Sequence, residues 1–201
     1  MNEYIDELIC EPFALQKFIR ESEKVRNDIC PSIGKEAGQL LYFLTKLTKA
    51  KNIMEIGTSI GYSTIWLAYA IKDFNGKIDT IEASERLSNE AKLNINALDL
   101  GEYVDFHVGF GEEIINTLKK TYDLIFIDSS TKSYKVLYEK SINKLKTGGL
   151  IIFEDVLFPS LEKRQIQKVM MDELNKMILE DNRVEKCFLN IGDGLLICLK
   201  K

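Results

Sequence analysis

The sequence predicts a doubly wound α/β fold: a mostly parallel seven-stranded sheet that ends in an antiparallel hairpin, with helices on both faces. Three observations predict it. Short apolar runs alternate with stretches of helical periodicity along most of the chain. The runs at 124–127 and 150–153 are almost entirely apolar, as in strands that are buried on both faces. The last two runs flank a glycine turn at 191–194, which is typical of a hairpin.

The elements follow one another in a regular order. Helical spacing is seen at 12–27 and at 35–48, where the apolar residues form one stripe: Leu40, Leu41, Phe43, Leu44 and Leu47. We expect strands at 52–56, 77–82, 104–108, 122–128 and 149–155, and helices between them at 62–72, 85–98, 111–120 and 134–145. A long amphipathic helix at about 160–181 precedes the hairpin strands 184–190 and 195–200. Strands that are joined through helices run parallel, with right-handed crossovers.

The composition fits one domain. The 201 residues are 45% hydrophobic, and a chain of this length buries roughly 70% of its unfolded surface without needing disulfides or metals. We therefore expect a single domain over 1–201, with a helical segment at 1–48 before the first strand. The 27 basic and 31 acidic residues give a net charge of −4, which does not favour a nucleic-acid partner.

The cysteines and the N-terminus indicate the compartment. Cys10, Cys30, Cys187 and Cys198 show no paired spacing, so we expect reduced and mostly buried thiols. The acidic N-terminus lacks a signal-peptide pattern, and no apolar run approaches the ~20 residues of a membrane span. The expected location is the cytoplasm, with no membrane contact.

A glycine-rich turn follows the first strand. In EIGTSIGYS (55–63), Gly57 and Gly61 can adopt backbone angles that are closed to other residues, and the amides at the following helix start favour polar or anionic groups. Glu82 ends the next strand, where a carboxylate can accept two hydrogen bonds from a ribose diol. Taken alone, each feature has an alternative: the glycine turn is a tight turn without a ligand, and Glu82 is a solvated acid. Together the two features favour a nucleoside-containing cofactor.

The spacing of the turn argues against a dinucleotide. A dinucleotide fingerprint needs G-x-G-x-x-G, so that a pyrophosphate can sit on the helix start. Ser59 stands where the second glycine would be. A nicotinamide or flavin dinucleotide is therefore not expected.

Six segments together resemble a known family. They are GKEAGQLL (34–41), EIGTSIGYS (55–63), TIEAS (80–84), DLIFIDSSTKSY (123–134), LKTGGLIIFEDVL (145–157) and IGDGLLICLK (191–200). In this order they resemble the class I S-adenosylmethionine-dependent O-methyltransferases of the catechol and caffeoyl-CoA type, with their small prokaryotic members. The resemblance covers most of the chain and implies a Rossmann-like fold in which segment 1–48 helps to cover the cofactor and the acceptor.

The resemblance also implies roles for individual residues. Gly57, Ser59, Gly61 and Ser63 would line the methionine end of the cofactor, with Glu55 supporting the loop and Glu82 holding the ribose hydroxyls. Ala83, Gly111 and Glu112 fall where the family surrounds the adenine, and Ile33 falls where a preceding segment closes over the cofactor. Asp128 is expected both to contact the cofactor and to act in catalysis.

Three acids are expected to meet at one rim of the sheet. Asp128 ends the fourth strand, Glu154 and Asp155 end the fifth, and these strands are neighbours in the fold that the resemblance implies. Three close anions repel unless a cation or raised pKa values relieve them, and an oxygen-only set suits Mg²⁺, Ca²⁺ or Mn²⁺. The family places a divalent ion here, which lowers the pKa of the acceptor oxygen. The alternative is an acidic rim without metal.

The sequence departs from the family pattern at two places. Glu154–Asp155 stands where the family usually has Asp–Asn, which adds a methylene group and a charge. Thr131 stands where many relatives have the lysine that takes the acceptor proton. Lys132 is the candidate base, and its alternatives are a surface lysine or direct loss of the proton to water.

Three other residues lie near these motifs. Phe110 is expected either beside the adenine or in the core. His107 and Trp66 are both expected to be structural.

The predicted function is methyl transfer from S-adenosylmethionine to a hydroxyl of a small, catechol-like acceptor, assisted by a divalent cation. One alternative is a metal-independent methyltransferase that acts on tRNA or on a nitrogen acceptor. Another is a degenerate protein that binds the cofactor without catalysis. The resemblance further implies a homodimer, formed through the N-terminal helices or the terminal hairpin.

Overall fold

Seven strands form one sheet in the computed structural model, in the order β3-β2-β1-β4-β5-β7-β6. The strands are β1 (Asn52–Ile56), β2 (Lys77–Glu82), β3 (Val104–Val108), β4 (Tyr122–Ile127), β5 (Leu145–Phe153), β6 (Val184–Leu189) and β7 (Leu195–Lys200). β7 runs against both of its neighbours, and the other six strands share one direction. The predicted doubly wound sheet with a terminal antiparallel hairpin is confirmed. The structure describes residues 3–201, so Met1 and Asn2 of the predicted domain and helical segment lie outside the described residues.

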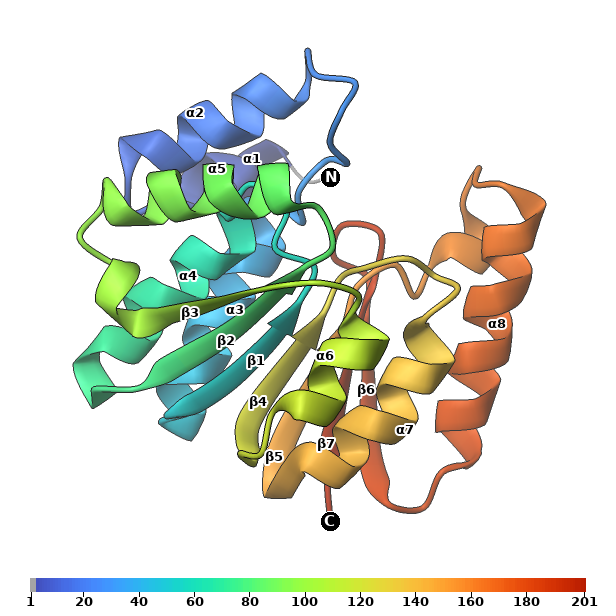
Figure 1. Ribbon diagram of the computed structural model, residues 1–201. Helices are drawn as coiled ribbons and strands as arrows, with labels where there is room; N and C mark the ends of the chain where they lie inside the picture. The colour runs from blue at the N-terminus through green and yellow to red at the C-terminus, as the bar shows by residue number, and fades with distance from the viewer. Residues whose placement is uncertain (1–2) are drawn as a thin grey trace.

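Helices cover both faces of the sheet (Figure 1). They are α1 (Glu3–Leu8), α2 (Ala14–Glu23), α3 (Gly34–Thr48), α4 (Tyr62–Ile71), α5 (Glu85–Asn96), α6 (Gly111–Thr117), α7 (Tyr134–Lys144) and α8 (Gln165–Glu180). One core cluster joins the sheet to α3, α4 and α5, and a second joins its other face to α6, α7 and α8. Burial of apolar surface on both faces is the main stabilising contribution.

Some predicted boundaries were wrong. β5 begins at Leu145 rather than 149, because Leu145 pairs with Tyr122 before the register shifts; the polar KTG that follows disguises this start. α8 begins at Gln165, since a separate turn of 3₁₀-helix occupies Phe158–Ser160. α1 was not predicted.

The apolar stripe predicted for the helix at 35–48, which corresponds to α3, was also wrong in part. Phe43 is 59% exposed and Leu47 is 66% exposed. The buried side of α3 runs instead through Ala37, Gly38, Leu41 and Thr45. A Cβ atom on Gly38 would lie 2.2 Å from Nε1 of Trp66 on α4, so the helix turns its small residues toward this neighbour.

Trp66 and His107 have structural roles, as expected. Trp66 is buried in the core. Nε2 of His107 lies 2.9 Å from Oδ1 of the buried Asp79, which also accepts a hydrogen bond from the Tyr122 hydroxyl at 3.0 Å.

Exposure decides between two alternatives for Phe110 and contradicts one expectation for the cysteines. Phe110 is 63% exposed, which excludes the core alternative and leaves its place beside the adenine a prediction. Cys10, Cys30 and Cys187 are exposed, and only Cys198 is buried. Cys187 lies on β6, the edge strand of the sheet.

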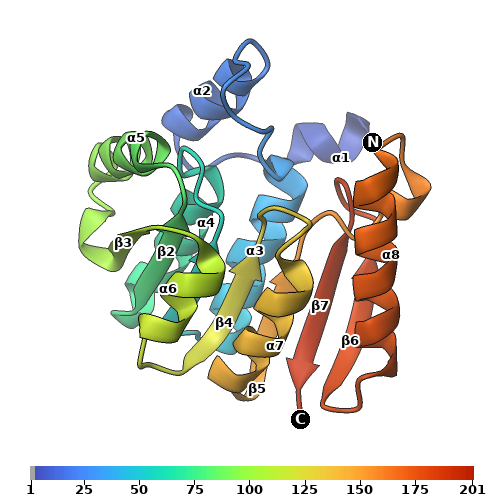
Figure 2. The same cartoon turned by 45° about the vertical axis from the view of Figure 1, so that its right-hand side comes forward.

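Helices α1 and α2 lie beyond the carboxyl ends of the parallel strands, on the side toward which β4 points (Figure 2). Glu11, in the loop between α1 and α2, accepts a hydrogen bond from the Tyr62 hydroxyl at 2.8 Å and from Nε of Arg20 at 2.8 Å. Tyr62 begins α4 directly after the glycine turn. The segment before α3 is therefore fastened to the carboxyl end of β1. Within residues 3–201, no helix has the length and apolarity needed to cross a bilayer.

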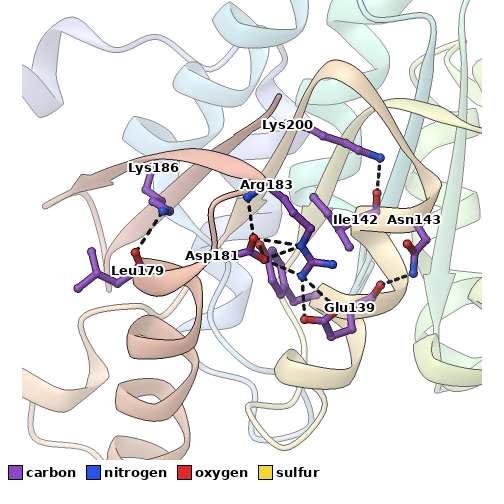
Figure 3. A network of polar contacts seen from close by, with 9 residues as sticks. Glu139, Ile142, Asn143, Leu179, Asp181, Arg183, Lys186 and Lys200 are labelled. Atoms are coloured by element: carbon purple, nitrogen blue, oxygen red, sulfur yellow. Dashed lines mark hydrogen bonds and ion pairs between the residues drawn. The ribbon is translucent and has the colours of Figure 1, made fainter.

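A polar network holds the turn between α8 and β6 against α7 (Figure 3). Asp181 accepts hydrogen bonds from the Arg183 backbone N–H at 2.7 Å, from the Arg183 guanidinium and from the Tyr138 hydroxyl at 2.6 Å. Arg183 also contacts Glu139 of α7 at 2.9 Å. Hydrogen bonds from Arg183 hold the pKa of Asp181 well below its usual range. The ionised carboxylate therefore stabilises the fold.

Replacing Asp181→Asn is expected to lower the free energy of unfolding by about 1–3 kcal/mol at neutral pH, because charged hydrogen bonds are lost. A depressed folded pKa contributes stability above the unfolded pKa of about 3.9, and this stability is lost as the pH falls. The difference between variant and wild type should thus shrink below about pH 4. Urea denaturation at both pH values checks this.

The matched control is Asp172→Asn, whose carboxylate pairs with Lys176 on the exposed face of α8. It should change stability by less than about 0.5 kcal/mol. Equal losses in the two variants, or a loss at Asp181 that persists in acid, would contradict the assignment.

Candidate functional site

The glycine turn lies at the switch point of the sheet, where the chain, having built β2 and β3 on one side of β1, returns to β4 on the other. The backbone has positive φ at Gly57 (101°), Ser59 (49°) and Gly61 (94°). A Cβ atom on Gly57 would lie 1.6 Å from the carbonyl oxygen of Asp128. Only glycine permits this approach between the ends of β1 and β4.

Glu82 faces the turn. Its Oε2 accepts a hydrogen bond from the Ser59 N–H and its Oε1 accepts one from the Ser84 N–H, both at 2.9 Å. The carboxylate is only partly buried. The acid at the end of β2 and the turn at the end of β1 are therefore brought together, in the arrangement that a nucleoside site requires.

Glu55 supports the turn from beneath, where it is fully buried. It accepts hydrogen bonds from Ser63 at 2.7 Å and from Thr64 and Thr80 at 2.6 Å. Burial raises the pKa of Glu55, and these three hydroxyls act against that rise. The Ser63 hydroxyl therefore donates its proton to Glu55. The predicted contact of Ser63 with the methionine end of the cofactor would not use this proton.

The predicted adenine side lies between β2 and α6. Ala83 is exposed, and Gly111 is buried where a Cβ atom would lie 2.5 Å from Cγ2 of Ile56. The Glu112 carboxylate accepts a hydrogen bond from Ser133. Phe110 precedes α6 with its ring exposed. The contacts of these residues with adenine stay a prediction.

Asp128, Glu154 and Asp155 are brought together at the carboxyl ends of β4 and β5. Each offers an oxygen, and the three oxygens lie within 4.8 Å of one another. Asp155 has a positive φ of 70°, and its N–H donates to Oε2 of Glu154 at 2.5 Å. We call these residues the acidic cluster.

The electrostatics of the acidic cluster are unfavourable without a cation. Burial raises the pKa of Asp128 to about 8, and Asp155 and Glu55 add to the rise. Burial and the neighbouring acids also raise the pKa of Glu154. Burial raises the pKa of Asp155, while Lys163 and the Tyr134 hydroxyl act against that rise. An all-oxygen set of this kind fits a hard divalent ion.

Ile33 and the hairpin turn close the site from the other side. Ile33 is buried just before α3. A Cβ atom on Gly192 would lie 3.2 Å from Oε1 of Glu154 and 3.6 Å from the Ile33 carbonyl oxygen. The loop before α3, the end of β5 and the β6–β7 turn therefore meet at one place.

The candidate base lies in the loop after β4. Thr131 is buried and Lys132 is exposed. The structure therefore places the Lys132 side chain at the surface, while Glu154 of the acidic cluster is buried and Asp128 and Asp155 are partly buried. Among residues 3–201, the buried Oγ atoms of Ser59 and Ser129 have no hydrogen-bond partner, which fits a site that receives a polar ligand.

Sequence reasoning missed several residues that contribute to the site. Thr58, Thr64 and Thr80 form a buried hydroxyl network around Glu55, in which the Thr58 and Thr80 hydroxyls lie 2.6 Å apart. No pattern in the sequence signalled this network, because Thr58 lies in the turn, Thr64 in α4 and Thr80 within β2. Glu23 and Asp193 act electrostatically on Asp128 from distant parts of the chain. No local pattern could reveal them.

Fold and site together define a class I methyltransferase. The family model described as "O-methyltransferase" matches residues 7–201. A caffeoyl-CoA O-methyltransferase from Nicotiana tabacum is 33% identical over 179 residues, covering 81% of this chain and 74% of that protein. The chain belongs to the O-methyltransferase family, and the resemblance to its S-adenosylmethionine-dependent caffeoyl-CoA type is confirmed.

Solved structures agree. A candidate caffeoyl-CoA O-methyltransferase from Staphylococcus aureus is 30% identical with a TM-score of 0.88, covering 99% of this chain and 98% of that one. An O-methyltransferase from Bacillus cereus, solved in complex with SAH, has the same fold with a TM-score of 0.87, at 23% identity and with 100% and 96% of the two chains covered.

The acidic cluster makes a testable prediction about stability. Acids whose folded pKa is raised bind protons more tightly in the folded state, so the metal-free protein should lose stability as the pH rises from about 4 to about 8. Asp155→Asn removes one charge and keeps a residue that tolerates positive φ. It should stabilise the metal-free protein by about 1 kcal/mol near pH 8, and not at all near pH 4. Urea denaturation in a chelator checks this.

The control for this experiment is Glu113→Gln, an exposed acid in the first turn of α6. It should leave the pH dependence unchanged. If Asp155→Asn destabilises the metal-free protein at high pH, mutual repulsion does not dominate the cluster.

Proposed function

We propose that this protein transfers a methyl group from S-adenosylmethionine to a hydroxyl oxygen of a small diol acceptor, with a divalent cation at the acidic cluster. One observation carries the proposal. The glycine turn and the acidic cluster share a boundary, since a Cβ atom on Gly57 would lie 1.6 Å from the Asp128 carbonyl oxygen. A donor held on the turn and an acceptor held at the cluster would be neighbours, which is the main requirement of in-line transfer.

The two bound groups would supply the chemistry: the cofactor its sulfonium methyl group, and the divalent ion a lowered pKa of the acceptor hydroxyl. The protein's own residues bind and orient. Backbone N–H groups of the turn and the Glu82 carboxylate would hold the nucleoside, with Glu55 keeping the turn in place. Ala83, Gly111 and Glu112 would surround the adenine.

Cover over the site would come from the N-terminal segment. Ile33 is buried against the hairpin turn, and Glu11 bonds to Tyr62 beside the glycine turn. These contacts support a role for residues 1–48 in excluding water from the cofactor and the acceptor, within one domain over 1–201. Exclusion of water strengthens every electrostatic contact in the site.

Metal binding by Asp128, Glu154 and Asp155 is supported by their three convergent oxygens and by the cost of burying them unpaired. Glu154 would reach the ion with one methylene more than the family's usual Asp. Asp155 would add a charge where Asn is usual. Mg²⁺, Ca²⁺ and Mn²⁺ all suit such a set.

The acceptor proton would pass to Lys132. Lys132 is exposed and lies four residues after Asp128. It directly follows Thr131, which stands where many relatives have the lysine, and its side chain is flexible. Asp128 would act beside it by holding the ion that polarises the acceptor.

A homodimer is proposed as well. Phe43 and Leu47 on α3 and Leu199 on β7 are exposed apolar side chains. α3 and the Leu195–Ile197 side of β7 belong to the same core cluster, so these residues lie on one side of the sheet. Sedimentation of the wild type and of Leu199→Asp would detect the dimer and its loss. A cytoplasmic location is likewise proposed, which cell fractionation can check.

The central experiment is a calorimetric titration with S-adenosylmethionine, followed by a methyl-transfer assay on catechol with and without Mg²⁺. We expect cofactor binding, and turnover that depends on the ion. Glu82→Gln should weaken cofactor binding by roughly tenfold or more, since it loses charged hydrogen bonds. The control Glu85→Gln, on the exposed start of α5, should bind normally.

Other outcomes would separate the alternatives. Turnover on a tRNA or a nitrogen acceptor without metal would replace this proposal. Cofactor binding without turnover on any acceptor would mark a degenerate protein.

Lys132→Met should lower kcat by roughly 100-fold, as expected for loss of a general base, while cofactor affinity stays unchanged. A pH–rate profile of the variant should lose the limb that belongs to the base. Lys135→Met, a change of another lysine three residues away, is the control and should retain activity. Full activity of the Lys132 variant would show that the proton leaves directly to water.

A further inference from the structure

We propose that Tyr134 is a positioning residue for the divalent ion: it ties the end of β4 to the end of β5 and so sets the spacing of the acidic cluster. This inference rests on the proposed function, because it takes the acidic cluster as the site of the ion. It gives a role to the last residue of the segment DLIFIDSSTKSY (123–134), which neither the cofactor nor the proposed base accounts for.

The Tyr134 hydroxyl holds the loop after β4. Tyr134 is the first residue of α7 and is 1% exposed. Its hydroxyl oxygen accepts a hydrogen bond from the Ser129 N–H at 3.1 Å. Ser129 directly follows Asp128, and the Ser133 N–H donates to the Ser130 carbonyl at 2.9 Å within the same loop. The hydroxyl therefore fixes the backbone where the chain leaves Asp128.

The ring of Tyr134 packs against the end of β5. Its centroid lies 6.0 Å from the centroid of the Phe153 ring, with an angle of 52° between the two planes. Phe153 is fully buried and directly precedes Glu154, whose N–H donates to the Ile127 carbonyl at 3.1 Å. Because protein interiors are close-packed, this contact limits movement of the strand end. One side chain thus contacts both strand ends that carry the acids.

The proton of the Tyr134 hydroxyl is directed to the acidic cluster. A phenol that accepts one hydrogen bond still has its own proton to donate, and buried polar groups are nearly always paired. The hydroxyl acts as a hydrogen-bond donor toward the Asp155 carboxylate. Carboxylates that bind metal ions are commonly oriented by such outer hydrogen bonds. A donor at one oxygen of Asp155 leaves its other oxygen for the ion.

Tyr138 offers a matched comparison within the same helix. It is fully buried on α7, and its ring centroid also lies 6.0 Å from that of Phe153, at an angle of 55°. Its hydroxyl, however, donates to Oδ2 of Asp181 at 2.6 Å, at the turn between α8 and β6. The two tyrosines therefore share a helix, a degree of burial and a neighbouring ring, and they differ in the acid that the hydroxyl meets.

The test measures binding of Mn²⁺ alone to the full-length protein by electron paramagnetic resonance, in which the signal of free Mn²⁺ is lost on binding. Tyr134→Phe removes the hydroxyl and keeps the ring. We expect its Kd for Mn²⁺ to rise roughly tenfold or more, as is typical when an outer hydrogen bond of a metal site is lost. Tyr138→Phe should bind Mn²⁺ as the wild type does.

Stability and cofactor binding separate positioning from a merely structural role. Each variant loses a buried hydrogen bond, so both should unfold at lower urea concentration than the wild type. Both should still bind S-adenosylmethionine. In the catechol assay, the Mg²⁺ concentration needed for half-maximal activity should rise in Tyr134→Phe and stay unchanged in Tyr138→Phe.

A second measurement keeps the hydroxyl in place and decides the question if Tyr134→Phe does not fold. Fluorotyrosine is placed at 134 in one sample and at 138 in another, and fluorine NMR spectra are recorded as Mg²⁺ is added. The resonance at 134 should shift as the ion binds, since the hydroxyl contacts a ligand of the ion. The resonance at 138 should stay in place.

The inference is wrong if Tyr134→Phe binds Mn²⁺ as tightly as the wild type, if Tyr138→Phe weakens binding equally, or if the fluorine resonance at 134 does not move. In these cases the wild type still binds the ion and methylates the diol, so the proposed function stands. If the wild type does not bind Mn²⁺, the proposed metal site fails and the inference fails with it.

Discussion

Repulsion among the carboxylates of Asp128, Glu154 and Asp155 is the constraint on which the rest of the site depends. Their oxygens lie within 4.8 Å of one another, and burial raises the pKa of each acid. An arrangement of this kind costs stability unless a cation relieves it. The sheet holds it nonetheless, because β4 and β5 are central strands with apolar contacts on both faces.

The same strand ends bring the cofactor turn to the acids. Gly57 approaches the Asp128 carbonyl more closely than any side chain would allow, while Glu55 and its three hydroxyl donors hold the turn from below. The N-terminal segment and the hairpin turn then meet over Glu154, through Ile33 and Gly192. Donor binding, acceptor binding and cover are therefore combined at one switch point.

The sequence predicts those parts of the site that lie next to each other in the chain or at the ends of parallel strands. Gly57 and Glu82 are of this kind, since periodicity locates the strands and their carboxyl ends share an edge. The meeting of Asp128, Glu154 and Asp155 was expected from the strand order that the family resemblance implies. Glu23, Asp193 and Lys163 depend on how the N-terminal segment and the hairpin fold back over the sheet, which local pattern does not specify. The predictions for Phe43 and Leu47 were wrong for a related reason: an apolar residue at helical spacing gives the same local pattern whether its side chain is packed or exposed.

The most direct measurement is calorimetric titration of Mg²⁺ into the cofactor-free protein near pH 7, repeated in buffers with different ionisation enthalpies. Metal ligands must be deprotonated, and the pKa of Asp128 is raised to about 8. The account predicts that each bound ion releases protons, and that this release declines as the pH rises. Binding without proton release, or no binding at millimolar Mg²⁺, would contradict it.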